Sequence, residues 1–207
     1  MSDTHEKIDH DFYTKERWSN WLGQVKESGF EFKEEEENSG KEGAIFVTME
    51  DDIILACLKV IAKYENKTLP LDDAIAIIKD IRDITLEEVE PVSEDIDMML
   101  ESVQTALAGS FAACECYIAG DFDKESSIED LIAVAIEYEE AEDIDSAITC
   151  IAQVGALILN GKNLPEAAME DLPYGLVAEW LDGIDSVEAA MIGADGYKED
   201  DGEDDGS

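Results

Sequence analysis

Residues 93–120 read SEDIDMMLESVQTALAGSFAACECYIAG, and this stretch decides the fold class. Ser93 is a preferred residue for capping the start of a helix, and Gly120 is a preferred residue for ending one. We therefore predict one long helix over residues 94–119. Its middle, Thr105–Ala113, is rich in Ala, Gly and Ser, and such small residues let neighbouring helices approach closely. This composition predicts that the helix lies at the centre of a helical bundle.

On both sides of this helix, apolar residues recur at the spacing of amphipathic helices. The run Ala44–Thr48 (AIFVT) differs, since it has the composition of a β-strand, although one strand alone has no partner to pair with. The expected helices cover residues 14–28, 49–65, 70–89, 128–140, 144–159, 165–171 and 174–182, with a last turn at 185–192. The sequence therefore predicts an all-α fold, an antiparallel bundle of about six to eight helices.

Composition divides the chain into three parts. Residues 1–43 hold a loose leader, an N-terminal amphipathic helix and an acidic linker, whose run EFKEEEENSGKEG is typical of a flexible connection. Residues 44–192 form the helical bundle domain. Residues 193–207 are expected to be a disordered acidic tail, because they carry many carboxylates without apolar periodicity.

The charge of the chain limits its partners. The 207 residues include 53 acidic and 14 basic side chains, which gives a net charge of −39. Binding to nucleic-acid phosphates or to an anionic membrane surface needs clusters of Lys and Arg, so both classes are excluded. Residues 1–82 carry 19 acidic and 11 basic side chains, whereas residues 83–207 carry 34 and 3. The acidic part indicates either a salty cytoplasm that screens the repulsion or a basic protein partner.

The sequence has the features of a cytoplasmic protein. The N-terminus lacks the apolar segment of a signal peptide. The longest uncharged stretch, Ser146–Gly161, has 16 residues, and a membrane-spanning helix needs about 20. We therefore predict no membrane span. The four cysteines lie within apolar helical patterns rather than in the loops of a disulfide scaffold, which indicates a reducing compartment.

Few residues suggest catalysis. The two histidines, His5 and His10, both lie in the leader, and general acid–base chemistry most often uses histidine. The chain also lacks the glycine-rich motifs that cradle phosphates. We therefore assign no catalytic residue and no cofactor, and we predict a protein that is not an enzyme.

Metal binding is an alternative function for two groups of residues. Cys57, Cys114, Cys116 and Cys150 are expected in the core as small apolar side chains, and a four-thiolate zinc site is the alternative. The acidic segment 121–145 starts like a calcium loop but lacks the glycine and the last glutamate of that motif. A solvated acidic face is the prediction for this segment, and a divalent-cation site or a metal-dependent enzyme is the alternative.

The helix expected at 14–28 is the candidate partner-binding element. Large apolar side chains lie on it and just before it, next to the expected flexible linker: Phe12, Tyr13, Trp18, Trp21 and Leu22. Such a helix either folds back onto the bundle or inserts its aromatic side chains into a groove of a protein partner. A homodimer through the small residues 105–113 is a further alternative.

Three segments resemble a known family. They read FYTKERWSNWL (12–22), DDIILACLKVI (51–61) and IIKDIRDITLEEVE (77–90). With these motifs the chain resembles an uncharacterised archaeal family, domain of unknown function 2150. The resemblance implies an archaeal, cytoplasmic protein of unknown role, and it transfers no active site because the motifs are structural in character. Together with the composition, it leads us to predict an acidic helical protein that serves as a protein–protein interaction or scaffold module.

Overall fold

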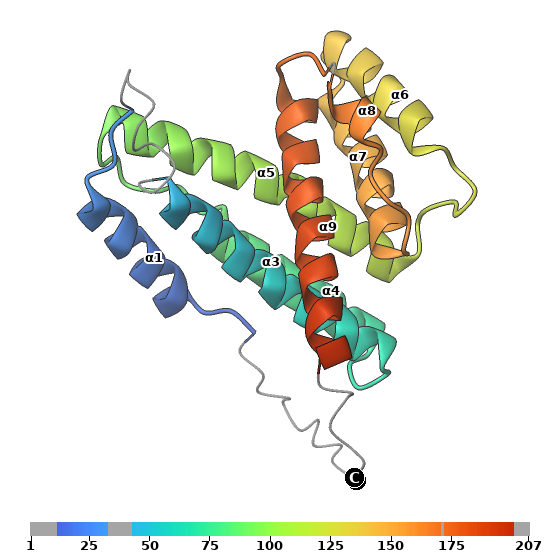
Figure 1. Ribbon diagram of the computed structural model, residues 1–207, viewed down its shortest axis with the longest axis horizontal. Helices are drawn as coiled ribbons and strands as arrows, with labels where there is room; N and C mark the ends of the chain where they lie inside the picture. Colours follow the sequence, from blue (N-terminus) through green and yellow to red (C-terminus); the bar gives the residue numbers. More distant parts are fainter. Residues whose placement is uncertain (1–11, 33–42, 171, 201–207) are drawn as a thin grey trace, which may run out of the picture.

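The computed structural model describes residues 12–32, 43–170 and 172–200 (Figure 1). Within these residues it contains eight helices and no strand, which confirms the predicted all-α bundle. The helices are α1 (Lys15–Ser28), α3 (Ala44–Glu65), α4 (Leu71–Thr85), α5 (Glu94–Ala119), α6 (Ile128–Glu140), α7 (Ile144–Leu159), α8 (Glu166–Glu170) and α9 (Leu176–Asp200). The predicted leader, most of the predicted linker and the end of the predicted tail lie outside the described residues.

Helix α5 lies at the centre of the bundle, as its small residues predict. It packs against α3, α4, α7 and α9, and Figure 1 shows α9 crossing over it. At the crossing, a methyl group on Gly109 would lie only 2.8 Å from Trp180 Cβ, so the two backbones are close. The Ser110 hydroxyl donates to the Gly183 carbonyl oxygen at 3.1 Å. The small residues suggested for a homodimer contact are thus covered by other helices of the same chain.

The expectation of a strand-like run at Ala44–Thr48 is wrong. This run forms the first turns of α3, which begins at Ala44 rather than near residue 49. Phe46, Met49 and Ile53 are all buried and recur at helical spacing, so burial of one helix face outweighs the local β preference of the run. The Thr48 hydroxyl donates to the Ala44 carbonyl oxygen within the helix, and it therefore does not cap the N-terminus.

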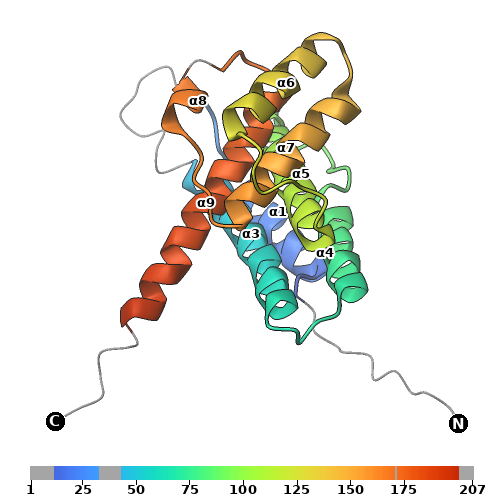
Figure 2. The same ribbon diagram turned by 90° about the vertical axis from the view of Figure 1, so that its right-hand side faces the viewer.

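The C-terminal helix is longer than the sequence pattern indicates. The expected helix at 174–182 and the expected turn at 185–192 are parts of the single helix α9, which continues to Asp200. Glycine is typical of a helix end, but Gly183 lies inside α9. Glycine is needed there because a methyl group would lie 2.1 Å from the Ala106 carbonyl oxygen of α5. Figure 2 shows the C-terminal part of α9 projecting beyond the other helices.

The N-terminal helix begins and ends as predicted. Thr14 Oγ1 accepts a hydrogen bond from the backbone N–H of Arg17, and Gly29 ends α1 with a left-handed φ of 61°. Helix α1 packs against α3 and α4. Helix α4 is shorter than expected and ends at Thr85. The side-chain amide of Gln104 donates to the Thr85 carbonyl oxygen at 2.8 Å, which fixes the chain where it leaves α4.

Candidate functional site

The aromatic residues of the predicted docking helix lie against the bundle. Tyr13 and Trp18 are buried, with 6% and 4% of their surface exposed. Burial raises the pKa of Tyr13 above its ordinary value. The Lys63 ammonium lies over the Phe12 ring, 5.1 Å from the ring centroid. Leu22 is partly buried and packs on the core.

A carboxylate of α3 holds this helix in place. Trp21 Nε1 donates to Asp52 Oδ2 at 2.8 Å, and Arg17 Nε donates to the same oxygen at 2.8 Å. A second hydrogen bond joins Arg17 Nη2 to Asp52 Oδ1, so the pair is bidentate. The hydrogen bond to Asp52 raises the pKa of Arg17. In this conformation, Tyr13 and Trp18 are part of the hydrophobic core. A partner would reach most of their surface only after α1 leaves the bundle.

The cysteines lie in the core, as predicted, and do not form a cluster of ligands. Cys57, Cys114 and Cys150 are buried free thiols, and Cys116 is half-buried. The pKa of Cys57 is raised by its hydrogen bond with Cys114 and by burial. Over the part of the chain that the structure describes, no three His, Cys, Asp or Glu side chains come together in a way that could hold a metal ion. This finding gives the four-thiolate alternative no support.

The acidic segment 121–145 uses several of its carboxylates as helix caps. Asp143 accepts hydrogen bonds from the backbone N–H and the hydroxyl of Ser146 at the start of α7. Glu139 of α6 accepts from the backbone N–H of Leu176 at 2.5 Å, at the start of α9. A carboxylate is favourable at the positive end of a helix. These contacts give the segment a structural role, and they assemble no group of metal ligands.

One carboxyl group is held between α3 and α9 at a raised pKa. Burial raises the pKa of Glu50 to about 7, and the nearby charges of Asp182 and Asp51 add to the effect, whereas a hydrogen bond from Ser186 opposes it. Among the described residues, no group donates to its buried Oε1 atom. Burial also raises the pKa of Asp182. Because Glu50 is not among the residues that line the hollow described next, we assign it no role in binding.

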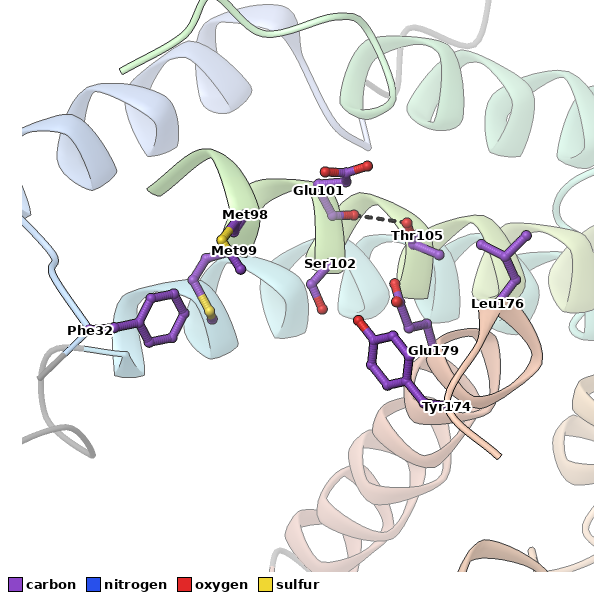
Figure 3. Close-up of a pocket in the computed structure, with 9 residues that line it drawn as sticks. All are labelled: Phe32, Met98, Met99, Glu101, Ser102, Thr105, Tyr174, Leu176 and Glu179. Atoms are coloured by element: carbon purple, nitrogen blue, oxygen red, sulfur yellow. Dashed lines mark hydrogen bonds between the residues drawn. The ribbon is translucent and has the colours of Figure 1, made fainter. Parts of the chain in front are cut away.

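The best candidate site is a hollow between α5 and the loop that precedes α9 (Figure 3). Its volume is about 380 Å³. Three apolar side chains stand out from its rim, with 96% of Tyr174, 55% of Met98 and 54% of Phe32 exposed. The residues that line it are Phe32, Met98, Met99, Glu101, Ser102, Thr105, Tyr174, Leu176 and Glu179.

Specific contacts fix the Phe32 segment and the loop after Tyr174 on either side of the hollow. The Phe32 backbone N–H donates to Asp95 Oδ2 at 2.9 Å, and the Phe32 ring packs edge-on against Phe30 with centroids 5.1 Å apart. On the other side, the Glu139 carboxylate binds the backbone just after Tyr174. A methyl group at Gly175 would lie 2.6 Å from Glu139 Oε1, which shows how closely this carboxylate approaches the backbone.

The hollow combines apolar surface with negative charge. Its lining includes the carboxylates of Glu101 and Glu179 and no basic side chain. None of the five predicted partner-binding residues lines it, although Trp18 and Leu22 line a separate hollow beside α1. No sequence pattern points to this site, because Phe32, Met98 and Tyr174 come from segments that are far apart in the chain and show no common motif.

Comparison with known proteins places the chain in a family. No curated protein and no solved structure matches it. None of the helices in the described part of the chain is long and apolar enough to cross a membrane. The model of one family, described as an uncharacterized protein conserved in archaea (DUF2150), matches residues 11–200 and confirms the resemblance seen in the sequence. The chain therefore belongs to the archaeal family DUF2150.

Proposed function

We propose that the protein is a non-enzymatic interaction module that binds a protein partner in the hollow of Figure 3. The observation that carries the proposal is the exposure of Phe32, Met98 and Tyr174 around one concave surface. Large apolar side chains that gather on a surface and are rimmed by polar groups mark interaction sites. Tyrosine and methionine are also enriched at protein interfaces.

The chemistry of the hollow suits recognition better than catalysis. General acid–base groups work best near the reacting atoms and with a pKa close to the working pH. The group with such a value, Glu50, is not among the residues that line the hollow. The carboxylates of Glu101 and Glu179 instead favour a partner that presents positive charge.

The proposal includes a cytoplasmic location. The four cysteines lie within helices, and Cys57, Cys114 and Cys150 are buried in the core rather than placed in the loops of a disulfide scaffold. Such cysteines are typical of proteins from reducing compartments, which supports a cytoplasmic place of action.

A pull-down from extracts of the native host tests the function. The baits are the wild-type chain, the double variant Met98→Ser/Tyr174→Ser, and the control Val134→Ser/Ile144→Ser. The control removes apolar side chains of α6 and α7 that are also exposed, at 39% and 38%, but that do not line the hollow. Proteins captured by the wild-type and control baits are expected to be lost with the hollow variant.

The recovered partner is then purified, and its Kd for each bait is measured by calorimetry. Truncation of two central contact residues is expected to weaken binding at least about tenfold, since such residues each contribute more than about 1 kcal/mol. Equal melting temperatures of the three baits verify that folding is intact. Equal Kd values for the wild-type chain and the hollow variant would overturn the proposal.

A further inference from the structure

Two further hollows adjoin the hollow of Figure 3 through shared lining residues. A second hollow, of about 450 Å³, lies between the end of α1 and the start of α5 and shares Phe32 with the first. A third, of about 370 Å³, lies between α1 and the chain at residues 87–92 and shares Lys26 and Val92 with the second. Neighbouring hollows share lining residues, and we call the three hollows together the acidic track.

We infer that the acidic track binds a linear protein segment that is rich in Lys and Arg and carries apolar side chains between them. This inference rests on the proposed function, because it takes the hollow of Figure 3 as one end of the binding surface. It adds the length of the bound segment, its chemistry, and a contribution from α1.

Charge decides the chemistry of the occupant. Among the described residues that line the track, the one basic side chain is Lys26. Acidic side chains line all three hollows, and they are Glu31, Glu87, Glu88, Glu90, Glu94, Asp95, Glu101 and Glu179. Glu87 is already paired with Lys15 at 3.4 Å, and Asp95 accepts the Phe32 N–H. The other carboxylates leave a strongly negative surface that attracts a basic segment.

Apolar side chains recur along the same path. Leu22, which is partly buried, lines the third hollow. Val92 lies where the second and third hollows meet, and Phe32 lies where the first and second meet. At the far end, Met98 and Tyr174 are the exposed apolar contacts (Figure 3). This alternation of apolar contacts and carboxylates favours an occupant in which apolar and basic residues alternate, with the apolar residues as anchors.

The helices give the length of the track. Trp18 to Lys26 spans about 12 Å along α1, and Asp95 to Thr105 spans about 15 Å along α5, at about 1.5 Å per residue. An extended segment covers about 3.3 Å per residue, so the stretches along the two helices alone need about eight residues. The first hollow alone takes a shorter peptide segment. An experiment can therefore separate binding in the first hollow from binding along the whole acidic track.

The test uses a displayed library of random peptides about twice as long as the track needs. Peptides are selected on the wild-type chain, and the strongest is synthesised with a fluorescent label. Its Kd is measured by fluorescence anisotropy for the wild-type chain and for two variants. Met98→Ser/Tyr174→Ser changes the first hollow, and Glu88→Gln/Glu90→Gln changes the third. The matched control is Glu137→Gln/Glu140→Gln, which removes two charges from α6.

The selected peptides are expected to be enriched in Lys and Arg, and both track variants are expected to bind more weakly than the control. The loss is at least about tenfold for the first hollow and about fivefold for the third, since each exposed charge contributes less than an apolar anchor. Added KCl should weaken binding to the wild-type chain more than to Glu88→Gln/Glu90→Gln.

The remaining outcomes separate the track from the proposed function. If only the change in the first hollow weakens binding, the inference of a track fails and the proposed function stands. Selected peptides without basic residues would likewise overturn the track and leave the proposed function standing. If neither variant differs from the control, or if only the change in the third hollow matters, both the track and the proposed function are overturned.

Discussion

Replacing Glu50 with glutamine should remove a pH dependence from the stability of the bundle. Glu50 is buried between α3 and α9, and its pKa rises from an ordinary value of 4.5 to about 7. Between these two values the folded protein binds more protons than the unfolded chain, so the free energy of unfolding falls as the pH rises. The effect of Glu50 is absent below about pH 4.5 and complete above about pH 7.

The magnitude follows from the difference between the two pKa values. One pKa unit corresponds to about 1.4 kcal/mol, so ionised Glu50 lowers the free energy of unfolding by at most about 3 kcal/mol. Glutamine keeps the shape of the side chain and an oxygen that can accept the Ser186 hydrogen bond. Glu50→Gln should therefore be more stable than the wild type by up to about 3 kcal/mol at about pH 8, and equally stable at about pH 4.5.

Urea unfolding followed by far-ultraviolet circular dichroism measures this difference, at constant ionic strength and at several pH values. Asp182 next to Glu50 has a raised pKa as well. The informative quantity is thus the difference between variant and wild type. Glu140→Gln on the surface of α6 serves as the control. If Glu50→Gln loses as much stability as the wild type between about pH 5 and about pH 8, the reasoning is refuted.

Three further predictions concern stability. Gly183→Ala should lower the free energy of unfolding by about 1–3 kcal/mol in thermal melts, because the added methyl group meets a backbone oxygen of α5 at 2.1 Å; Gly23→Ala on α1 has open space and should instead stabilise by about 0.5–1 kcal/mol. Asp52→Ala should cost about 1–3 kcal/mol and alter the fluorescence of Trp21, whose indole N–H loses its acceptor; an unchanged emission spectrum would contradict the contact. The melting temperature should rise with KCl concentration because salt screens the repulsion of a net charge of −39, and a flat response would show that this repulsion is not destabilising.

Much of the fold could be predicted because local signals agree with tertiary packing. Helix α5 has its cap at Ser93, its end at Gly120 and its small residues where α7 and α9 cross it. The hairpin of α6 and α7 likewise starts and ends at the expected residues. The prediction for Ala44–Thr48 failed because the local preference of this run is for a strand, whereas burial of Phe46 and Met49 favours a helix.

The candidate site could not be predicted, for a different reason. Sequence periodicity tells which face of a helix is buried, but it does not tell which segments meet across the bundle. Tyr174 and Met98 line the same hollow because Glu139 fixes the loop before α9, and no pattern in the sequence reports the contact of Glu139 with that loop. The aromatic pattern of the helix Lys15–Ser28 is visible in the sequence and predicts a partner-binding element. In the structure, however, Tyr13 and Trp18 are buried in the core of the chain.

Helices α5 and α9 cross with their backbones in close contact. The backbones touch at Gly109 and Gly183, and α9 is one continuous helix on both sides of this point. Helix α9 also packs on α3, α6 and α7. The contact at Gly109 and Gly183 therefore fixes the direction of α9, and with it the position of the loop that carries Tyr174.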